Sequence, residues 1–130
     1  MRYLVAILFS VLSFATPYDL AKAYAQYYFK ALPMRIDDYF SLTALLDVGD
    51  ELYYHYKVND TARLVISQMS SEQIETYKKS LKKTNEDRLC KDERVIAMLN
   101  GGIKLHHLFY RETGARLLFE FVIDKRSCKI

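Results

Sequence analysis

Two cysteines, Cys90 and Cys128, are the only ones in this 130-residue chain, and they follow an N-terminal segment laid out like an export signal. A protein with two thiols in an oxidising compartment joins them, which ties the C-terminal end of the chain to its middle. Their spacing does not match the Cys-x-x-Cys pattern of a redox pair. We therefore predict a structural disulfide between Cys90 and Cys128 in a small exported domain.

The N-terminal segment has one positive charge, Arg2, followed by an apolar run that ends at Ala15. A short basic start before a short apolar run is typical of a secretory signal peptide. The run is too short to span a bilayer, which takes about 20 apolar residues, and Pro17 and Asp19 end it. We therefore expect membrane association only through an uncleaved leader, and a periplasmic or extracellular location after cleavage.

Two positions carry the small-x-small pattern of a cleavage site: Ser13 with Ala15, and Ala23 with Ala25. Cleavage after Ala15 gives an unusually short leader, whereas cleavage after Ala25 gives one of ordinary length. We expect the cut after Ala25 and keep Ala15 as the alternative.

With that cut, residues 1–25 form the signal peptide and residues 26–130 form a single α+β domain, whose short N-terminal arm ends near Pro33. Removing the leader takes away two basic residues and one acidic residue, so the net charge falls from +3 to about +2. Basic and acidic residues alternate along the rest of the chain, which argues against a nucleic-acid partner.

Alternating apolar residues predict two hairpins of β-strands. In the first run the even-numbered residues from Phe40 to Val48 are apolar, with Leu45 breaking the pattern, and Gly49-Asp50 supplies a turn. In the last run the odd-numbered residues from Leu117 to Ile123 line one face. The four predicted strands span residues 38–48, 52–58, 103–111 and 116–124.

Two helices are predicted between the hairpins. Ser70 followed by Gln73 is a capping-box signature, and an amphipathic stretch from residue 72 to residue 86 follows it. Asp92 can cap a shorter helix that ends before Gly101. The predicted order is strand, strand, helix, helix, strand, strand. This order favours an α+β fold with a four-stranded antiparallel sheet and both helices on one face.

The sequence contains no recognisable catalytic motif, and we predict no catalytic residue, metal site or cofactor. His106 and His107 are adjacent in a predicted strand, so their rings point to opposite faces and cannot share a metal. His55 from another strand could meet one of them, with Glu120 as a third ligand. The simpler interpretation is one surface histidine and one half-buried, hydrogen-bonded histidine.

Aromatic residues occur at both odd and even positions of the predicted strands, so some must face away from the helices. Tyr39, Tyr53, Tyr110 and Leu108 are the residues that we expect on this second face. An exposed aromatic patch favours binding of a partner. The N-terminal arm, or a second copy of the chain in a homodimer, could instead cover it.

The order of structural landmarks resembles that of small exported Gram-negative proteins of largely unassigned function. The matching residues are Pro33, Asp37, Thr43, Tyr54, Tyr56, Cys90, Gly102, Tyr110 and Cys128. A related α+β shape also looks like that of type II secretion pilotins, which guide an outer-membrane secretin. Those pilotins carry a lipid-modified cysteine, and this leader has none.

These observations favour an exported binding or accessory protein without catalytic activity, acting on a protein partner in envelope or secretion-system assembly. A small secreted hydrolase or metal-binding enzyme is one alternative, and it requires His55, His106 or His107 beside a carboxylate in a cleft. A secreted enzyme inhibitor is another, and it requires a protruding loop.

Overall fold

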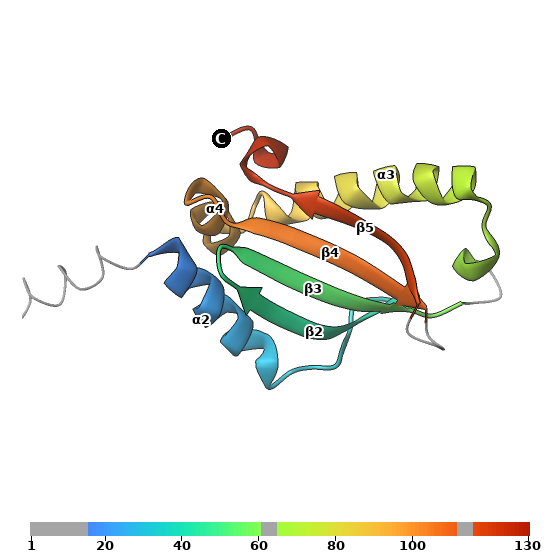
Figure 1. Ribbon diagram of the computed structural model, residues 1–130, viewed down its shortest axis with the longest axis horizontal. Coiled ribbons are helices and arrows are strands. Elements are labelled where there is room, and N and C mark those ends of the chain that lie inside the picture. Colours follow the sequence, from blue (N-terminus) through green and yellow to red (C-terminus); the bar gives the residue numbers. More distant parts are fainter. Residues whose placement is uncertain (1–15, 61–64, 112–115) are drawn as a thin grey trace, which may run out of the picture.

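The structure is a computed structural model that describes residues 16–60, 65–111 and 116–130. These residues form a five-stranded sheet with the spatial order β1-β2-β3-β4-β5 and three helices (Figure 1). The helices are α2 (Pro17–Phe29), α3 (Ser71–Leu89) and α4 (Glu93–Asn100). The strands are β1 (Met34–Arg35), β2 (Phe40–Val48), β3 (Glu51–Val58), β4 (Lys104–Arg111) and β5 (Leu117–Ile123). Two short 3₁₀ turns, η1 (Ile66–Gln68) and η2 (Lys125–Cys128), complete the described elements.

The sheet is mixed, because β3 and β4 pair in parallel while the other neighbouring strands pair antiparallel. The α+β class and the four long strands are confirmed, but the predicted four-stranded antiparallel sheet and the order ββααββ are wrong in detail. The 19-residue α3 is about 28 Å long, close to the roughly 26 Å of the eight-residue β3. Because α3 returns the chain to the start of β3, β4 runs in the same direction as β3.

A β-bulge in β2 explains the break in its alternation. Leu42 pairs with Tyr56 and Ala44 pairs with His55, so Thr43 is an extra residue without a partner in the register. After the bulge, the odd-numbered Leu45 points to the core, and the even-numbered Leu46 and Val48 point away from it. The prediction that all the even-numbered residues of this strand share one face is therefore wrong.

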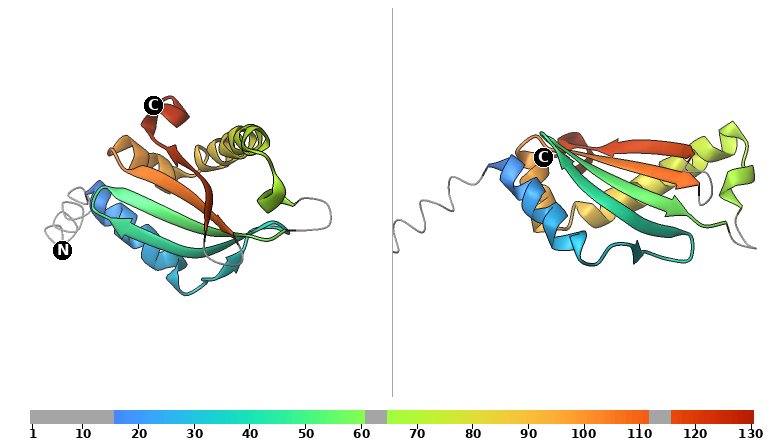
Figure 2. Two further views of the ribbon diagram at one scale, coloured as in Figure 1. Left: turned by 45° about the vertical axis from the view of Figure 1, so that its right-hand side comes forward. Right: turned by 60° about the horizontal axis from the view of Figure 1, so that its bottom comes forward.

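The helices cover one face of the sheet, and no helix in the described part of the chain lies on the other (Figures 1 and 2). The inner face supplies most of the core through alternate residues of β3, β4 and β5. Its strand residues are Phe40, Leu42, Leu45, Leu52, Tyr54, Tyr56, Val58, Leu105, His107, Phe109, Phe119, Phe121 and Ile123. Burying one face and leaving the other in solvent is the usual behaviour of largely antiparallel sheets.

Both helices that the sequence predicts begin at the predicted caps. The Ser70 side chain accepts a hydrogen bond from the Gln73 backbone, and the Gln73 side chain accepts one from Ser70 in return. Asp92 accepts a hydrogen bond from the Arg94 backbone at the start of α4. These side chains satisfy N–H groups that have no partner within the first turn of a helix.

The third helix, α2, was not predicted, because its residues fall in the expected leader and N-terminal arm. Thr16 and Asp19 form a capping box, and Pro17 occupies the first turn, where a missing N–H costs nothing. Ala21, Tyr24 and Ala25 are buried at helical spacing. The helix contacts α4, β2 and β3.

Gly101 allows the end of α4 to pack closely against the start of α2. A Cβ atom at Gly101 would overlap the ring of Pro17, so only glycine allows the two helix ends to approach so closely. From the sequence, Gly101 was expected only to end the helix. The close contact shows that α2 packs as a part of the domain.

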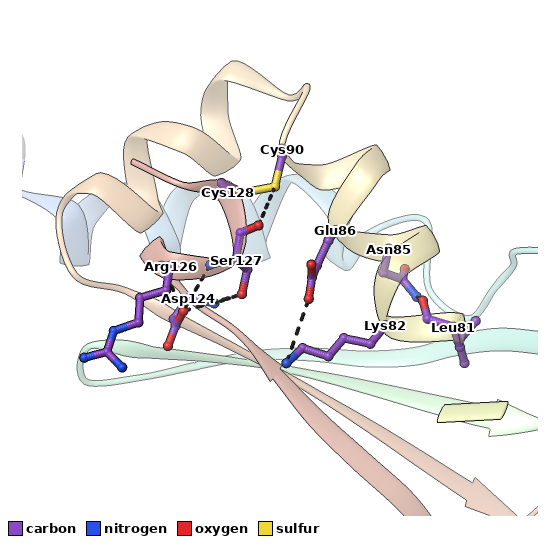
Figure 3. A network of polar contacts seen from close by, with 9 residues as sticks. All are labelled: Leu81, Lys82, Asn85, Glu86, Cys90, Asp124, Arg126, Ser127 and Cys128. Carbon is purple, nitrogen blue, oxygen red and sulfur yellow. Dashed lines mark hydrogen bonds and ion pairs between the residues drawn. A yellow bond between two sulfur atoms is a disulfide. The ribbon is translucent and has the colours of Figure 1, made fainter. Parts of the chain in front are cut away.

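The disulfide joins Cys90, at the C-terminal end of α3, to Cys128 in η2, with a Cα–Cα distance of 5.4 Å (Figure 3). Asp124 accepts hydrogen bonds from the backbones of Arg126 and Ser127, and this cap holds the turn that carries Cys128. The predicted pairing is present. It fixes the C-terminal end of β5 against the helical layer.

We propose that the leader is cleaved after Ala15 and that the exported protein starts at Thr16. Cleavage after Ala25 would remove Ala21 and Tyr24 from the core, whereas cleavage after Ala15 keeps all of α2 and its cap. Mass spectrometry of exported protein should give the mass of residues 16–130. A start at Gln26 or an intact Met1 would contradict this proposal.

Replacing both cysteines, with Cys90→Ala and Cys128→Ala, should destabilise the exported protein strongly. The bond closes a loop with a sequence separation of 38, which is worth roughly 4 kcal/mol in the chain-entropy model. For a domain of this size we expect the Tm to fall by more than about 10 °C. Thermal unfolding followed by circular dichroism measures this change. An unchanged Tm would show that the disulfide does not brace the fold.

Candidate functional site

The open face of the sheet carries cross-strand rows of aromatic, apolar and charged residues. In one row, Leu46 pairs with Tyr53 and His106 pairs with Val122, and the parallel register places Tyr53 beside His106. The next row runs through Ala44, His55, Leu108 and Glu120. Most of these side chains are half-exposed, and Leu46 is 48% exposed. The surface therefore mixes apolar area with polar groups.

Two stacked pairs of rings lie on this face. Tyr53 and His106 stack with ring centroids 4.4 Å apart, and His55 and Tyr110 stack at 5.3 Å. Each pair joins a residue of β3 to one of β4. Stacked rings on adjacent strands give a flat, rigid surface with polar edges, which is a common property of binding surfaces.

Glu51 connects the first pair by hydrogen bonds. His106 Nε2 lies 2.9 Å from Glu51 Oε1, and the Tyr53 hydroxyl donates to Glu51 Oε2 at 3.0 Å. The hydrogen bond from His106, followed by that from Tyr53, lowers the pKa of Glu51, and the bond to Glu51 raises the pKa of Tyr53. The carboxylate thus holds both rings in place.

The structure places three of the four residues that we expected on the second face along the open side of β3 and β4. Tyr53, Leu108 and Tyr110 lie in three successive cross-strand rows, beside His106, His55 and Lys57 respectively. Tyr39 lies apart from them. It precedes β2, and its partly buried ring packs against the core near Phe40.

The histidines do not assemble a metal site. His106 and His107 point to opposite faces, and Glu120 is separated from His55 by Leu108 in the cross-strand row. No group of three histidine, cysteine or acidic residues in the described ranges could hold a metal ion. The pair of His106 and Glu51 lies on the open sheet face. Neither residue lines the two pockets on the helical side of the sheet.

The inhibitor hypothesis requires a protruding loop. Two connecting segments, residues 61–64 and 112–115, lie outside the described residues. The hypothesis stays a prediction.

His107 is the buried polar residue of the inner face. Its ring stacks on Tyr54 at 4.3 Å, and its Nδ1 lies 2.9 Å from the hydroxyl of Tyr56. Burial lowers the pKa of His107 to about 3, so the ring is neutral at pH 7. Nε2 of His107 is buried without a hydrogen-bond partner, whereas the buried hydroxyl of Tyr54 interacts with that of Tyr24.

A groove of about 410 Å³, which was not expected from the sequence, runs between α2 and α4. Leu20, Ala23 and Tyr27 line it from α2, and Ala97 and Met98 line it from α4. The signal that could have revealed it is the pattern Thr16-Pro-Tyr-Asp19, a helix start that the leader assignment concealed.

Two charged residues at the start of α4, Glu93 and Arg94, also line this groove. The Arg94 guanidinium lies 5.3 Å from the ring centroids of both Tyr24 and Tyr27, within range of a cation–π interaction. It also forms an ion pair with Asp92 at 3.2 Å, and this hydrogen bond lowers the pKa of the Asp92 carboxyl. Arg94 therefore links the start of α4 to the aromatic residues of α2.

No protein-family model matches the chain, and no curated protein matches it in sequence. Three solved structures share its fold. A candidate secreted protein from Pseudomonas aeruginosa has a TM-score of 0.70 at 16% identity and covers 87% of this chain and 93% of its own. The type II secretion pilotin EpsS of Vibrio vulnificus has a TM-score of 0.66 at 13% identity, covering 88% of this chain and 93% of its own. The pilotin AspS of Vibrio cholerae has a TM-score of 0.62 at 17% identity, covering 86% and 92%.

At these identities the similarity establishes a shared fold. The expected likeness to the shape of pilotins is therefore supported by two solved pilotin structures. None of the helices in the described part of the chain has the length and hydrophobicity that crossing a bilayer requires.

Two tyrosine-to-phenylalanine substitutions on β3 should have different effects on stability. Tyr54→Phe removes a buried hydroxyl that interacts weakly with the hydroxyl of Tyr24, so the free energy of unfolding should fall by less than about 1 kcal/mol. Tyr56→Phe removes the partner of His107 and should lower it by about 1–3 kcal/mol. Urea unfolding of the two variants measures the difference. Equal losses in both would contradict the hydrogen bonding described here.

Proposed function

We propose that the protein is an exported, non-catalytic accessory protein that binds a partner protein of the cell envelope during assembly of a secretion system. Three observations support this function: the leader, the disulfide, and the fold shared with two type II secretion pilotins. The absence of a lipid-modifiable cysteine in the leader separates this chain from the lipidated pilotins.

The groove between α2 and α4 is the observation that carries the proposal. Its lining is mainly apolar, and Tyr27 beside it is 70% exposed. Phe29 at the end of the same helix is 76% exposed. Large apolar side chains in such positions are typical of a docking surface, and a groove between two helices suits an amphipathic helix of a partner.

The open sheet face is a second surface that could serve the same function. Tyr53, Leu108 and Tyr110 lie there in three successive rows, and the stacks of Tyr53 with His106 and of Tyr110 with His55 favour a flat partner surface. A second copy of the chain is one such partner, as in the homodimer considered from the sequence. The groove and the sheet face lie on opposite sides of the sheet, so substitutions can test them separately.

The test is affinity capture from envelope extracts with the exported protein and two sets of variants. Ala23→Gln with Ala97→Gln fills the groove with longer side chains that preserve helix propensity. Tyr53→Ala with Tyr110→Ala removes aromatic area from the open face. We expect wild type and the sheet-face variant to retain a component of the secretion apparatus, identified by mass spectrometry, and the groove variant to lose it.

Gln26→Ala is the matched control, because it is exposed on α2 but does not line the groove. It should retain the partner. Loss of the partner only in the sheet-face variant would assign binding to the other surface. Capture of no envelope-assembly component by the wild-type protein would refute the proposed function.

A further inference from the structure

The open face of the sheet carries exposed apolar area. Leu46 and Val48 of β2 point to this face and are 48% and 57% exposed. Beside Leu46, the cross-strand row continues with Tyr53, His106 and Val122, which are all half-exposed. Tyr53 and His106 stack and form a flat aromatic centre. Contiguous apolar area on an exposed face is typical of an interaction surface.

The two strands at the centre of this face, β3 and β4, pair in parallel, and sheets of parallel strands are usually covered on both sides. Here the described helices cover only one side (Figure 2). The four long strands have seven to nine residues, so the face is about 26 Å long and about 19 Å wide. Its flat area of about 500 Å² is a lower bound on what it can bury, against roughly 800 Å² per partner in a standard interface. The face is therefore large enough for a weak, reversible dimer.

The outward residues of β3 begin with an acidic residue and end with a basic one. Glu51 lies at the start of the strand, and Lys57 lies three outward positions further on, about 20 Å away. The Glu51 carboxylate is hydrogen-bonded to His106 and Tyr53, but each of its oxygens can accept another hydrogen bond. Lys57 forms no ion pair with any other residue that the structure describes. The central strand therefore has opposite charges at its two ends.

A two-fold axis that crosses the strands midway along β3 makes this face complementary to itself. The rotation places β3 over β3 of a second copy in the opposite direction, so Glu51 of each copy faces Lys57 of the other. Along β4, the same rotation places Lys104 over the ring of Tyr110 of the second copy, which suits a cation–π interaction. Sheets that pack face to face keep their strands within about 30° of each other, and this arrangement allows that angle.

We propose that the protein forms a symmetric dimer in which the open sheet faces of two copies pack against each other, with Glu51 of each copy paired to Lys57 of the other. The two-fold symmetry forms this ion pair twice. The stacked rings of Tyr53 and His106 lie in the middle of the contact and lose their exposure to solvent. The dimer is independent of the partner binding proposed above, because the groove between α2 and α4 lies on the helical side and stays accessible.

Sedimentation velocity of the purified exported protein, from about 1 μM to about 1 mM, tests the dimer. We expect the sedimentation coefficient to rise from that of a monomer to that of a dimer over this range. Glu51→Lys and Lys57→Glu should each raise the dissociation constant by about tenfold or more, because each places like charges opposite one another. Lys83→Glu is the matched control: it reverses an exposed charge of α3, on the helical side, and should leave the dissociation constant unchanged.

An equimolar mixture of the Glu51→Lys and Lys57→Glu chains is the decisive sample. In a mixed dimer both contacts again join opposite charges, so the mixture should dimerise in the wild-type concentration range, a recovery that misfolded chains could not show. The proposal is refuted if the wild-type protein stays monomeric throughout, if Lys57→Glu leaves the dissociation constant unchanged, or if the mixture stays monomeric. These measurements use purified protein alone, so their outcome is separate from that of the capture experiment.

Discussion

The parallel register between β3 and β4 creates the main features of both faces of the sheet. It places Tyr53 beside His106 and Tyr54 beside His107. The first pair stacks at 4.4 Å on the open face, and the second stacks at 4.3 Å in the core. A shift by one residue would exchange the faces, bury the ring that pairs with Glu51 and expose the ring that bonds to Tyr56. The exposed surface and the buried polar network therefore depend on one strand pairing.

The helical layer and the disulfide maintain this register. Parallel strands need a long crossover, and here α3 and α4 provide it. Cys90 lies between these two helices, and Cys128 follows β5, which pairs with β4. The bond thus connects the crossover to the strands that it positions. Without it, the C-terminal hairpin would be held to the helices by packing alone.

Local signals in the sequence predicted much of the fold. Alternation located four strands, and the caps at Ser70 and Asp92 located two helices, because these patterns arise from contacts between residues close in sequence. The parallel pairing, the bulge at Thr43 and the two-residue β1 depend on contacts between distant residues or on too few residues to form a pattern. Helix α2 carried a readable cap at Thr16, but the adjoining apolar leader dominated the interpretation.

The candidate sites were likewise predictable only where a local sequence pattern determines them. Strand alternation correctly separated Tyr53 and Tyr110 from the core, but it could not place Tyr39, which lies before the strand begins. The groove between α2 and α4 was missed, because alternation in the strands carries no information on how α2 packs against α4.

Helix α2 forms one wall of the groove proposed for partner binding. Tyr24 lines the groove beside α4 and also a separate cavity of about 180 Å³ on the helical side of the sheet, and Arg94 lies against its ring. Residues 16–25 therefore contribute to the core, to the groove and to the cavity wall. A cut after Ala25 would open the groove and the cavity together, because Leu20 and Tyr24 would be lost. The position of the leader boundary consequently determines whether the exported protein keeps its helical binding surface or presents the open sheet face alone.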